Sequence, residues 1–205
     1  RIVSEKTVTA MPETAIGLFP DVGGGYFLSR VDHFVGTYLA LTGKTLDGDN
    51  SIFTKIGTHI IENNLVDECI KKILDLKKYT KYDIDNILKK YDKKNKTQPS
   101  LEKNLQDISK HFNKKNIKEI INSLKAENSI WCKEQLSILK KKSPTSMGVA
   151  TRQLDISRSL NLKDCLSMEF RICQAMMARH DFYEGVRANL VDKDRDPKWK
   201  PITID

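Results

Sequence analysis

The hydrophobic pattern beyond Leu65 is helical almost throughout, and this pattern restricts the possible folds of the chain more than any other feature. Apolar residues recur there at i, i+3 and i+4, the spacing that places them on one face of an α-helix. The clearest sets are Ile70, Ile73 and Leu74, then Ile84, Ile87, Leu88 and Tyr91. Helices are predicted further on near residues 100–112, 116–127, 129–141, 145–156 and 162–179, with Pro144 near a first turn. The polar stretch 92–100 is predicted to be a loop.

The part of the chain before this region has the features of a sheet-bearing core. Residues 1–11 have the β-branched content of a long strand, and residues 58–61 are typical of a short one. Short helices are expected in between, over 24–29, 34–41 and 46–55. The sequence therefore predicts an α/β fold with a boundary near residue 62. Residues 1–62 would be the C-terminal part of an α/β core, and residues 63–205 a helical region.

The chain carries a net charge of +8, and the positive surplus lies in its middle. Residues 71–142 hold 20 Lys against 9 acidic residues, whereas the rest holds 15 Lys and Arg against 18 Asp and Glu. A solvated face of amphipathic helices is the simplest interpretation, and attraction to an acidic ligand is the functional alternative. The middle contains no Arg and no RNA-binding motif, so no nucleic-acid partner is expected. No run of about 18 apolar residues occurs, so no membrane-spanning helix is expected.

The cysteine and histidine residues do not indicate a metal site. The four cysteines are Cys69, Cys132, Cys165 and Cys173. They form no C-x-x-C pair, and their spacing suits neither zinc nor a disulfide framework, so we expect reduced thiols, the last three in packing roles. His59 and His111 stand apart from other metal ligands in the sequence. No metal and no redox cofactor is therefore expected.

A loop rich in proline and glycine, residues 11–25, carries the strongest chemical signal. It reads M-P-E-T-A-I-G-L-F-P-D-V-G-G-G and places two carboxylates, Glu13 and Asp21, eight residues apart among apolar side chains. Apolar surroundings desolvate a carboxylate, raise its pKa and suit it to acid–base chemistry. Local composition alone favours two structural roles over a catalytic one: Asp21 as a helix N-cap and Glu13 as a solvated loop residue.

The loop closely resembles the A-M-P-E-T-x-I-G-L-F-P-D-V-G-G motif of 3-hydroxyisobutyryl-CoA hydrolases, thioesterases of the crotonase (enoyl-CoA hydratase) superfamily. Further stretches resemble the same family: L-A-L-T-G over 39–43, K-S-P-T-S over 142–146, H-D-F-Y-E-G-V-R-A over 180–188 and the segment 192–201. The resemblance runs along nearly the whole chain and is weakest in the Lys-rich middle. It implies a crotonase-type ββα spiral core, truncated at its N-terminal side, followed by a mostly helical C-terminal region.

This resemblance implies hydrolysis of 3-hydroxyisobutyryl-CoA to 3-hydroxyisobutyrate and CoA, a step of valine breakdown in mitochondria. Glu13 would attack the thioester carbonyl or activate water against it, and Asp21 would bind the hydroxyl end of the substrate or act as the partner acid. Both residues would thus be catalytic and substrate-binding. CoA is part of the substrate, and no separate cofactor is implied. The residues that contact CoA, the oligomeric state and the choice between 3-hydroxyisobutyryl and 3-hydroxypropionyl groups stay open.

The resemblance also bears on what the 205 residues can do alone. In this superfamily the oxyanion hole consists of two backbone N–H groups from segments upstream of the Pro-Glu motif. The chain opens in a strand-like stretch, without an initiator methionine or a targeting segment. We therefore expect that an upstream part is missing and that the fragment by itself is inactive or nearly so.

Two other functions stay open. The first is another crotonase enzyme, such as an enoyl-CoA hydratase, which adds water across a double bond with two glutamates; Asp21 argues against it. The second is a hydrolase-like structural subunit, for example of a mitochondrial ribosome. The basic middle fits such a subunit, but a structural subunit would have no need of both Glu13 and Asp21.

Residues near the C-terminus are expected to stabilise the end of the fold. Glu184 and Arg187 are predicted to form an ion pair, and His180 to cap or pack a helix end. Trp199 has two possible roles: it covers the adenine or phosphate of CoA, or it anchors the C-terminal tail. The anchoring role is preferred.

Overall fold

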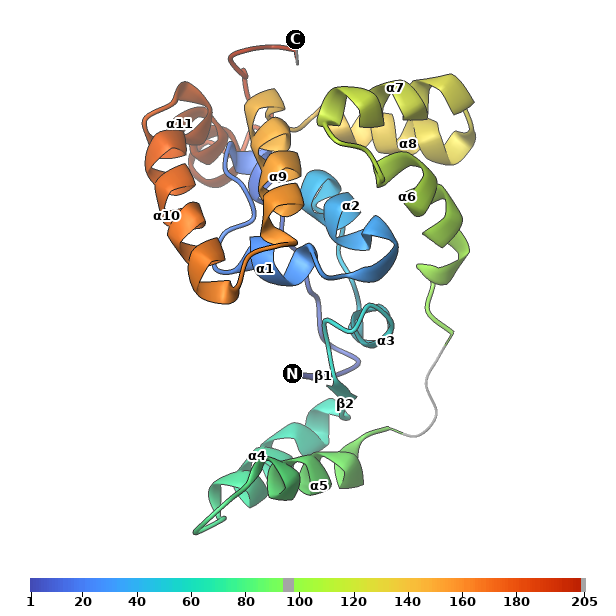
Figure 1. Cartoon of the computed structure of the whole chain (residues 1–205), viewed down its shortest axis with the longest axis vertical. Helices are drawn as coiled ribbons and strands as arrows, with labels where there is room; N and C mark the ends of the chain where they lie inside the picture. Colours follow the sequence, from blue (N-terminus) through green and yellow to red (C-terminus); the bar gives the residue numbers. More distant parts are fainter. Residues whose placement is uncertain (94–97, 204–205) are drawn as a thin grey trace. The chain divides into compact units, whose positions relative to one another are not determined.

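The computed structural model describes residues 1–93 and 98–203 (Figure 1). The central residues of the loop predicted over 92–100 therefore lie outside the described residues. The strands are β1 (Ile2–Val3) and β2 (His59–Ile60). The α-helices are α1 (Gly24–Leu28), α2 (Val35–Thr42), α3 (Gly48–Phe53), α4 (Val66–Leu74), α5 (Lys81–Tyr91), α6 (Leu105–Phe112), α7 (Ile117–Glu127), α8 (Ile130–Leu139), α9 (Pro144–Ser157), α10 (Leu162–Met177) and α11 (His180–Val186). Shorter helical turns are η1 (Glu13–Ile16), η2 (Asp32–Phe34), η3 (Asn63–Leu65), η4 (Glu102–Asn104) and η5 (Arg187–Val191).

The chain forms two compact units, and each combines two separate segments. The first unit comprises residues 1–9 and 45–103, and the second comprises residues 10–44 and 104–205. Because the segments alternate along the chain, these units are not the two parts separated by a boundary near residue 62. That boundary stays a prediction.

The first unit contains a small parallel sheet. Strand β1 pairs with β2, with Ile2 opposite His59 and Val3 opposite Ile60. The short strand predicted over 58–61 is therefore confirmed, whereas the long strand predicted over 1–11 is wrong in extent. Ser4 and Thr7 turn the chain by bonding each other through backbone and side chain, and such local bonds compete with a strand ladder.

Helices α4 and α5 pack side by side within the same unit (Figure 1). Tyr91 near the end of α5 donates a 2.7 Å hydrogen bond to Glu68 of α4. Helix α5 begins with a capping box, in which Thr80 and Asp83 satisfy each other's free backbone N–H groups. The helical pattern predicted beyond Leu65 is thus confirmed here.

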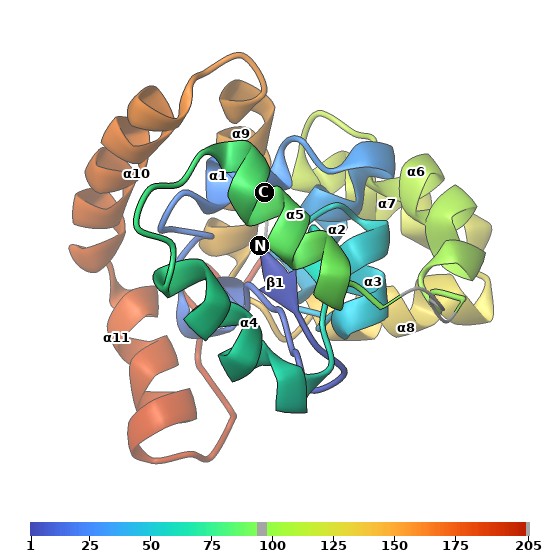
Figure 2. The same ribbon diagram turned by 90° about the horizontal axis from the view of Figure 1, so that it is seen from below.

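The second unit is a group of helices around α9. Helices α10 and α11 lie on one side of α9, and α6, α7 and α8 lie on the other (Figures 1 and 2). Side-chain caps begin four of these helices: Asn116 for α7, Ser129 for α8, Ser143 for α9 and Asn161 for α10. Pro144 occupies the first turn of α9, as predicted. No described helix is long and apolar enough to cross a membrane.

Candidate active site

The turn that carries Glu13 is held in place by several elements of the second unit. Thr14 is fully buried, and its carbonyl accepts a 3.0 Å hydrogen bond from the backbone N–H of Ser143. The carbonyl of Ala15 accepts a 2.8 Å bond from the side chain of Asn189. The turn η1 therefore has a fixed backbone, which is the first requirement for a side chain that must meet a reacting atom.

Two glycines allow this turn to approach α11 closely. Gly17 ends η1 with a φ of +73°, and a Cβ at that position would lie 2.1 Å from the carbonyl oxygen of Asp181. A Cβ at Gly185 would lie 2.3 Å from the carbonyl carbon of Ile16. Both distances are far shorter than real Cβ contacts, so the packing of η1 against α11 requires glycine on both sides.

Burial gives the Glu13 carboxylate unusual electrostatics. The side chain is half-buried, and its Oε2 atom is inaccessible to solvent and has no hydrogen-bond partner among the described residues. Burial raises the pKa of Glu13 to about 7, and the negative charge of Asp21 adds to the rise. The alternative of a solvated loop residue is therefore wrong. A carboxyl group that titrates near neutral pH suits general acid–base or nucleophilic work.

The raised pKa of Glu13 predicts an effect on stability. Its ionisation opposes folding, and the penalty is absent below the unfolded value of about 4.5 and complete above about 7. Glu13→Gln removes the charge, so the free energy of unfolding of the variant relative to the parent should be higher at pH 8 than at pH 4.5. Because solvent screens the partly exposed carboxylate, we expect a difference of roughly 1–2 kcal/mol. Urea denaturation of both proteins at the two pH values measures this difference. An equal difference at both would contradict the buried, uncharged state of Glu13.

The segment from Pro20 to Gly25 is fixed by a buried carboxylate on α10. Glu169 is only 4% exposed and accepts hydrogen bonds from the backbone N–H groups of Gly23 at 2.8 Å and Gly25 at 2.9 Å. Gln153 of α9 donates to the carbonyl of Pro20 at 2.7 Å and to Glu169 at 3.2 Å. The glycine-rich stretch is therefore held by charge-assisted bonds to Glu169 of α10 and by a neutral bond from Gln153 of α9.

Asp21 lies at the start of this fixed stretch. It does not cap α1: the N-cap position is Gly23, and only the backbone carbonyl of Asp21 accepts a bond, from Gly24 at 2.7 Å. Within the described residues no hydrogen bond or ion pair engages the Asp21 carboxylate. The next residue, Val22, is 80% exposed with a φ of +49°, which costs a β-branched residue on the order of 1–3 kcal/mol. Strain of this kind is often found beside functional groups.

Two structural carboxylates of this region were not singled out from the sequence. Glu169 lies within an ordinary amphipathic helix, and no local pattern distinguishes it from a solvated residue. Asp181 is 2% exposed and accepts bonds from Ser143 Oγ at 2.6 Å and the Lys200 N–H at 2.7 Å. Its neighbour His180 is the first residue of α11, and its Nδ1 lies 3.3 Å from Asp181 Oδ1. The His180 side chain is 40% exposed and caps no described helix, so its capping or packing role stays a prediction.

The structure agrees with the expected ion pair of Glu184 with Arg187 and with the expected anchoring by Trp199. Glu184 and Arg187 form an ion pair at 2.8 Å, and the hydrogen bonds from Arg187 lower the pKa of Glu184 to about 2. Trp199 is 9% exposed, and its indole N–H donates to the carbonyl of Lys141 at 3.2 Å. These contacts support the anchoring role of Trp199.

His111 stands apart from other metal ligands in the sequence but has two possible ligands beside it in the folded chain. Folding brings Glu127 and Cys132 beside it, and the three ligand atoms lie within 4.8 Å of one another. Spacing in the sequence could not reveal this group, because the residues come from three different helical segments. The four cysteines form no disulfide, as expected.

A basic cavity lies next to the Glu13 turn. It has a volume of about 450 Å³ and is lined by apolar residues and by Lys118, Lys125, Lys140 and Lys142. A Cβ at Gly43 would lie 3.2 Å from Lys142 Nζ and 3.1 Å from the Cα of Pro12, the residue before Glu13. Burial and the charge of Lys141 lower the pKa of Lys142. Lys142 therefore places one cation of this cavity close to the candidate catalytic turn.

Comparison with known proteins places the chain in a family. The family model described as enoyl-CoA hydratase/isomerase matches residues 1–205. The chain belongs to the enoyl-CoA hydratase/isomerase family. Among curated members it is 46% identical to the 3-hydroxyisobutyryl-CoA hydrolase, mitochondrial, of Dictyostelium discoideum and 43% identical to those of Gallus gallus and Homo sapiens. These matches cover 100% of the chain and 54–55% of the relatives, so the chain spans about half of their length.

Solved structures of the enoyl-CoA hydratase/isomerase family share the fold. A carnitinyl-CoA dehydratase from Mycobacterium thermoresistibile matches with a TM-score of 0.87 and 30% identity, and an enoyl-CoA hydratase from Rhodobacter sphaeroides with 0.82 and 27%. Each match covers 100% of this chain and 57% of the solved chain. The predicted fold class, a crotonase-type α/β fold with a mostly helical C-terminal region, is confirmed.

Proposed function

We propose that the protein to which this chain belongs hydrolyses the thioester of 3-hydroxyisobutyryl-CoA, releasing 3-hydroxyisobutyrate and CoA. The observation that carries this proposal is the Glu13 carboxyl group: half-buried, with an oxygen lacking a partner among the described residues and a pKa of about 7. It is supported by 40–46% identity over the whole chain to curated proteins of that name. Since those relatives are named mitochondrial, we also propose a mitochondrial location and a place in valine catabolism.

In this mechanism Glu13, once ionised, attacks the thioester carbonyl carbon or takes a proton from the water that attacks it. The C–S bond breaks, and the CoA thiolate leaves and takes up a proton. In the nucleophilic route the acyl group is then held on Glu13 as an anhydride, and water cleaves this anhydride to release 3-hydroxyisobutyrate and restore the carboxylate. The carboxylate of Asp21, which has no bond to the described residues, binds the 3-hydroxyl group of the acyl chain. The backbone segments that carry Glu13 and Asp21 are fixed before the substrate arrives. This lowers the entropic part of the activation free energy.

The lysine-lined cavity, in which Lys142 lies near Pro12, supports an acyl-CoA substrate. CoA carries phosphate groups, and lysine ammonium groups are suitable partners for phosphate. Four of the cavity's lining residues are lysines, and the apolar ones suit the uncharged part of the same ligand. The basic middle of the chain would then serve the binding of an acidic ligand.

The second candidate function is hydration of an enoyl-CoA, since both solved structures described above are named as a hydratase or a dehydratase. The two candidates differ in their products. A hydrolase releases a free thiol from 3-hydroxyisobutyryl-CoA, whereas a hydratase consumes the double bond of crotonyl-CoA without releasing a thiol.

The test compares both substrates on two proteins: the 205-residue chain, and the same chain joined behind the upstream part of a curated hydrolase, which would supply the oxyanion-hole N–H groups. We expect thiol release from 3-hydroxyisobutyryl-CoA by the joined protein and little or none by the chain alone. Hydration of crotonyl-CoA without thiol release would overturn the hydrolase proposal. Inactivity of a folded joined protein on both substrates would favour a structural role, testable as salt-sensitive association with ribosomes.

A further inference from the structure

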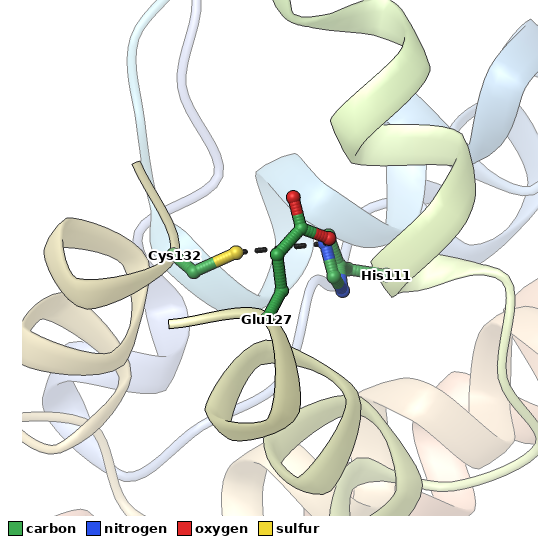
Figure 3. Close-up of side chains that lie close together, drawn as sticks. All are labelled: His111, Glu127 and Cys132. Carbon is green, nitrogen blue, oxygen red and sulfur yellow. Dashed lines mark hydrogen bonds and ion pairs between the residues drawn. The ribbon is translucent and has the colours of Figure 1, made fainter. Parts of the chain in front are cut away.

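A polar cluster lies away from the Glu13 turn, where the ends of three helical segments meet. Figure 3 shows His111 of α6, Glu127 at the end of α7 and Cys132 of α8 directed toward one another. His111 Nε2 lies 2.9 Å from Glu127 Oε2 and 3.5 Å from Cys132 Sγ. His111 and Cys132 are fully buried, while the side chain of Glu127 is 29% exposed. We propose that these three residues bind a divalent metal ion of the zinc class.

The donor atoms suit this type of ion. An imidazole nitrogen, a thiolate and a carboxylate oxygen are the three kinds of ligand that zinc uses in proteins. In a tetrahedral site with Zn–S of about 2.3 Å and Zn–N of about 2.0 Å, the sulfur and nitrogen are roughly 3.5 Å apart. The observed 3.5 Å between Cys132 and His111 has that value. The distance from Glu127 Oε2 to His111 Nε2 would need to lengthen by roughly 0.4 Å. All three ligand atoms lie within 4.8 Å of one another, so side-chain rotation of the partly exposed Glu127 would bring its oxygen to the ion.

The surroundings of His111 orient it for this role. Its other ring nitrogen, Nδ1, lies 2.9 Å from Ser123 Oγ. When Nδ1–H donates to that hydroxyl, the lone pair of Nε2 faces Glu127 and Cys132. Metal-binding histidines are usually held in this way, with the second nitrogen donating to a fixed acceptor.

Lys110 competes with a metal ion at this site. Its ammonium group lies 2.5 Å from Glu127 Oε2, and this hydrogen bond holds the pKa of Glu127 below its usual range. Binding would release the Cys132 thiol proton to solvent and turn the exposed Lys110 side chain away. The ion would then tie α6 to the α7–α8 turn, and water would take the fourth position on the partly exposed Glu127 side.

The test titrates the folded 205-residue chain, treated with a chelator, with Co²⁺ and then Zn²⁺. We expect one ion per chain and a thiolate-to-cobalt charge-transfer band, which Zn²⁺ displaces. Trp131 fluorescence should change in parallel, because its ring lies 6.1 Å from that of His111. Zn²⁺ should also raise the melting temperature, since it binds only the folded chain.

Matched variants assign the ligands. Cys132→Ser should weaken binding by about 100-fold or more and remove the band, because even outer-shell changes typically cost 10–100-fold. Cys173→Ser, at a cysteine outside the cluster, should leave the metal affinity and the charge-transfer band unchanged. A band that survives Cys132→Ser, or a parent that binds no ion, overturns the proposal.

A second variant tests whether Glu127 binds the ion, and it does so even if Cys132→Ser does not fold. Lys110→Gln changes a side chain that is 62% exposed and removes the cation that competes for Glu127. It should tighten Co²⁺ and Zn²⁺ binding by about 2- to 5-fold, the scale of an exposed ion pair. An unchanged affinity would mean that Glu127 is not a ligand and that the cluster is only a buried hydrogen-bonded group.

Discussion

Glu13→Gln should lower thioester hydrolysis of the joined protein by about 10²–10⁴-fold, the usual contribution of a positioned acid–base group. The amide keeps the shape of the side chain but can neither attack a carbonyl nor accept a proton from water. Steady-state thiol release with 3-hydroxyisobutyryl-CoA measures the loss. The matched control is Glu62→Gln, at an exposed glutamate of the first unit, which should retain the parent rate.

The pH dependence of the parent enzyme separates this role from a structural one. The Glu13 carboxyl must be ionised to act, so kcat/KM should rise with pH through about 7 and level off above it. A profile that is flat between pH 5 and 9, or a Glu13→Gln variant with near-normal turnover, would remove Glu13 from the chemistry. Measuring the variant's melting temperature alongside ensures that loss of rate is not loss of fold.

Gly17→Ala should destabilise the second unit by roughly 3–5 kcal/mol, one of the largest effects expected of a single methyl group. Its Cβ would lie 2.1 Å from the carbonyl oxygen of Asp181, an atom of the backbone that cannot move away without displacing α11. The φ of +73° adds a further penalty of about 1–2 kcal/mol for any residue with a Cβ. Thermal or urea denaturation measures the change.

Gly148→Ala is the control for this prediction. Gly148 lies within α9, and a Cβ there would meet nothing within 4 Å. Alanine favours a helix over glycine by about 1 kcal/mol, so this variant should be as stable as the parent or slightly more so. If Gly17→Ala were as harmless as Gly148→Ala, the close packing of η1 against α11 would be wrong.

Motif and periodicity predicted much of the fold from the sequence. The helices α7 to α10 lie within a few residues of their predicted ranges, because apolar spacing and the caps at Asn116, Ser129 and Asn161 are local signals. The strand over residues 1–11 was overpredicted. β-branched content favours an extended chain, but the turn at Ser4 and Thr7 and the pairing of β1 with a partner distant in sequence decide where the strand ends.

For the candidate site, too, the sequence determined some features and the tertiary structure determined others. The sequence alone determined that Glu13 and Asp21 share a stiff loop among apolar residues, since the order of residues fixes that. The tertiary structure decided the environment of the loop: the burial that brings the pKa of Glu13 to about 7, and the support from Glu169 and Asp181. It also brought His111 together with Glu127 and Cys132. Desolvation and ligand geometry depend on which segments pack together, and spacing along the chain carries no such information.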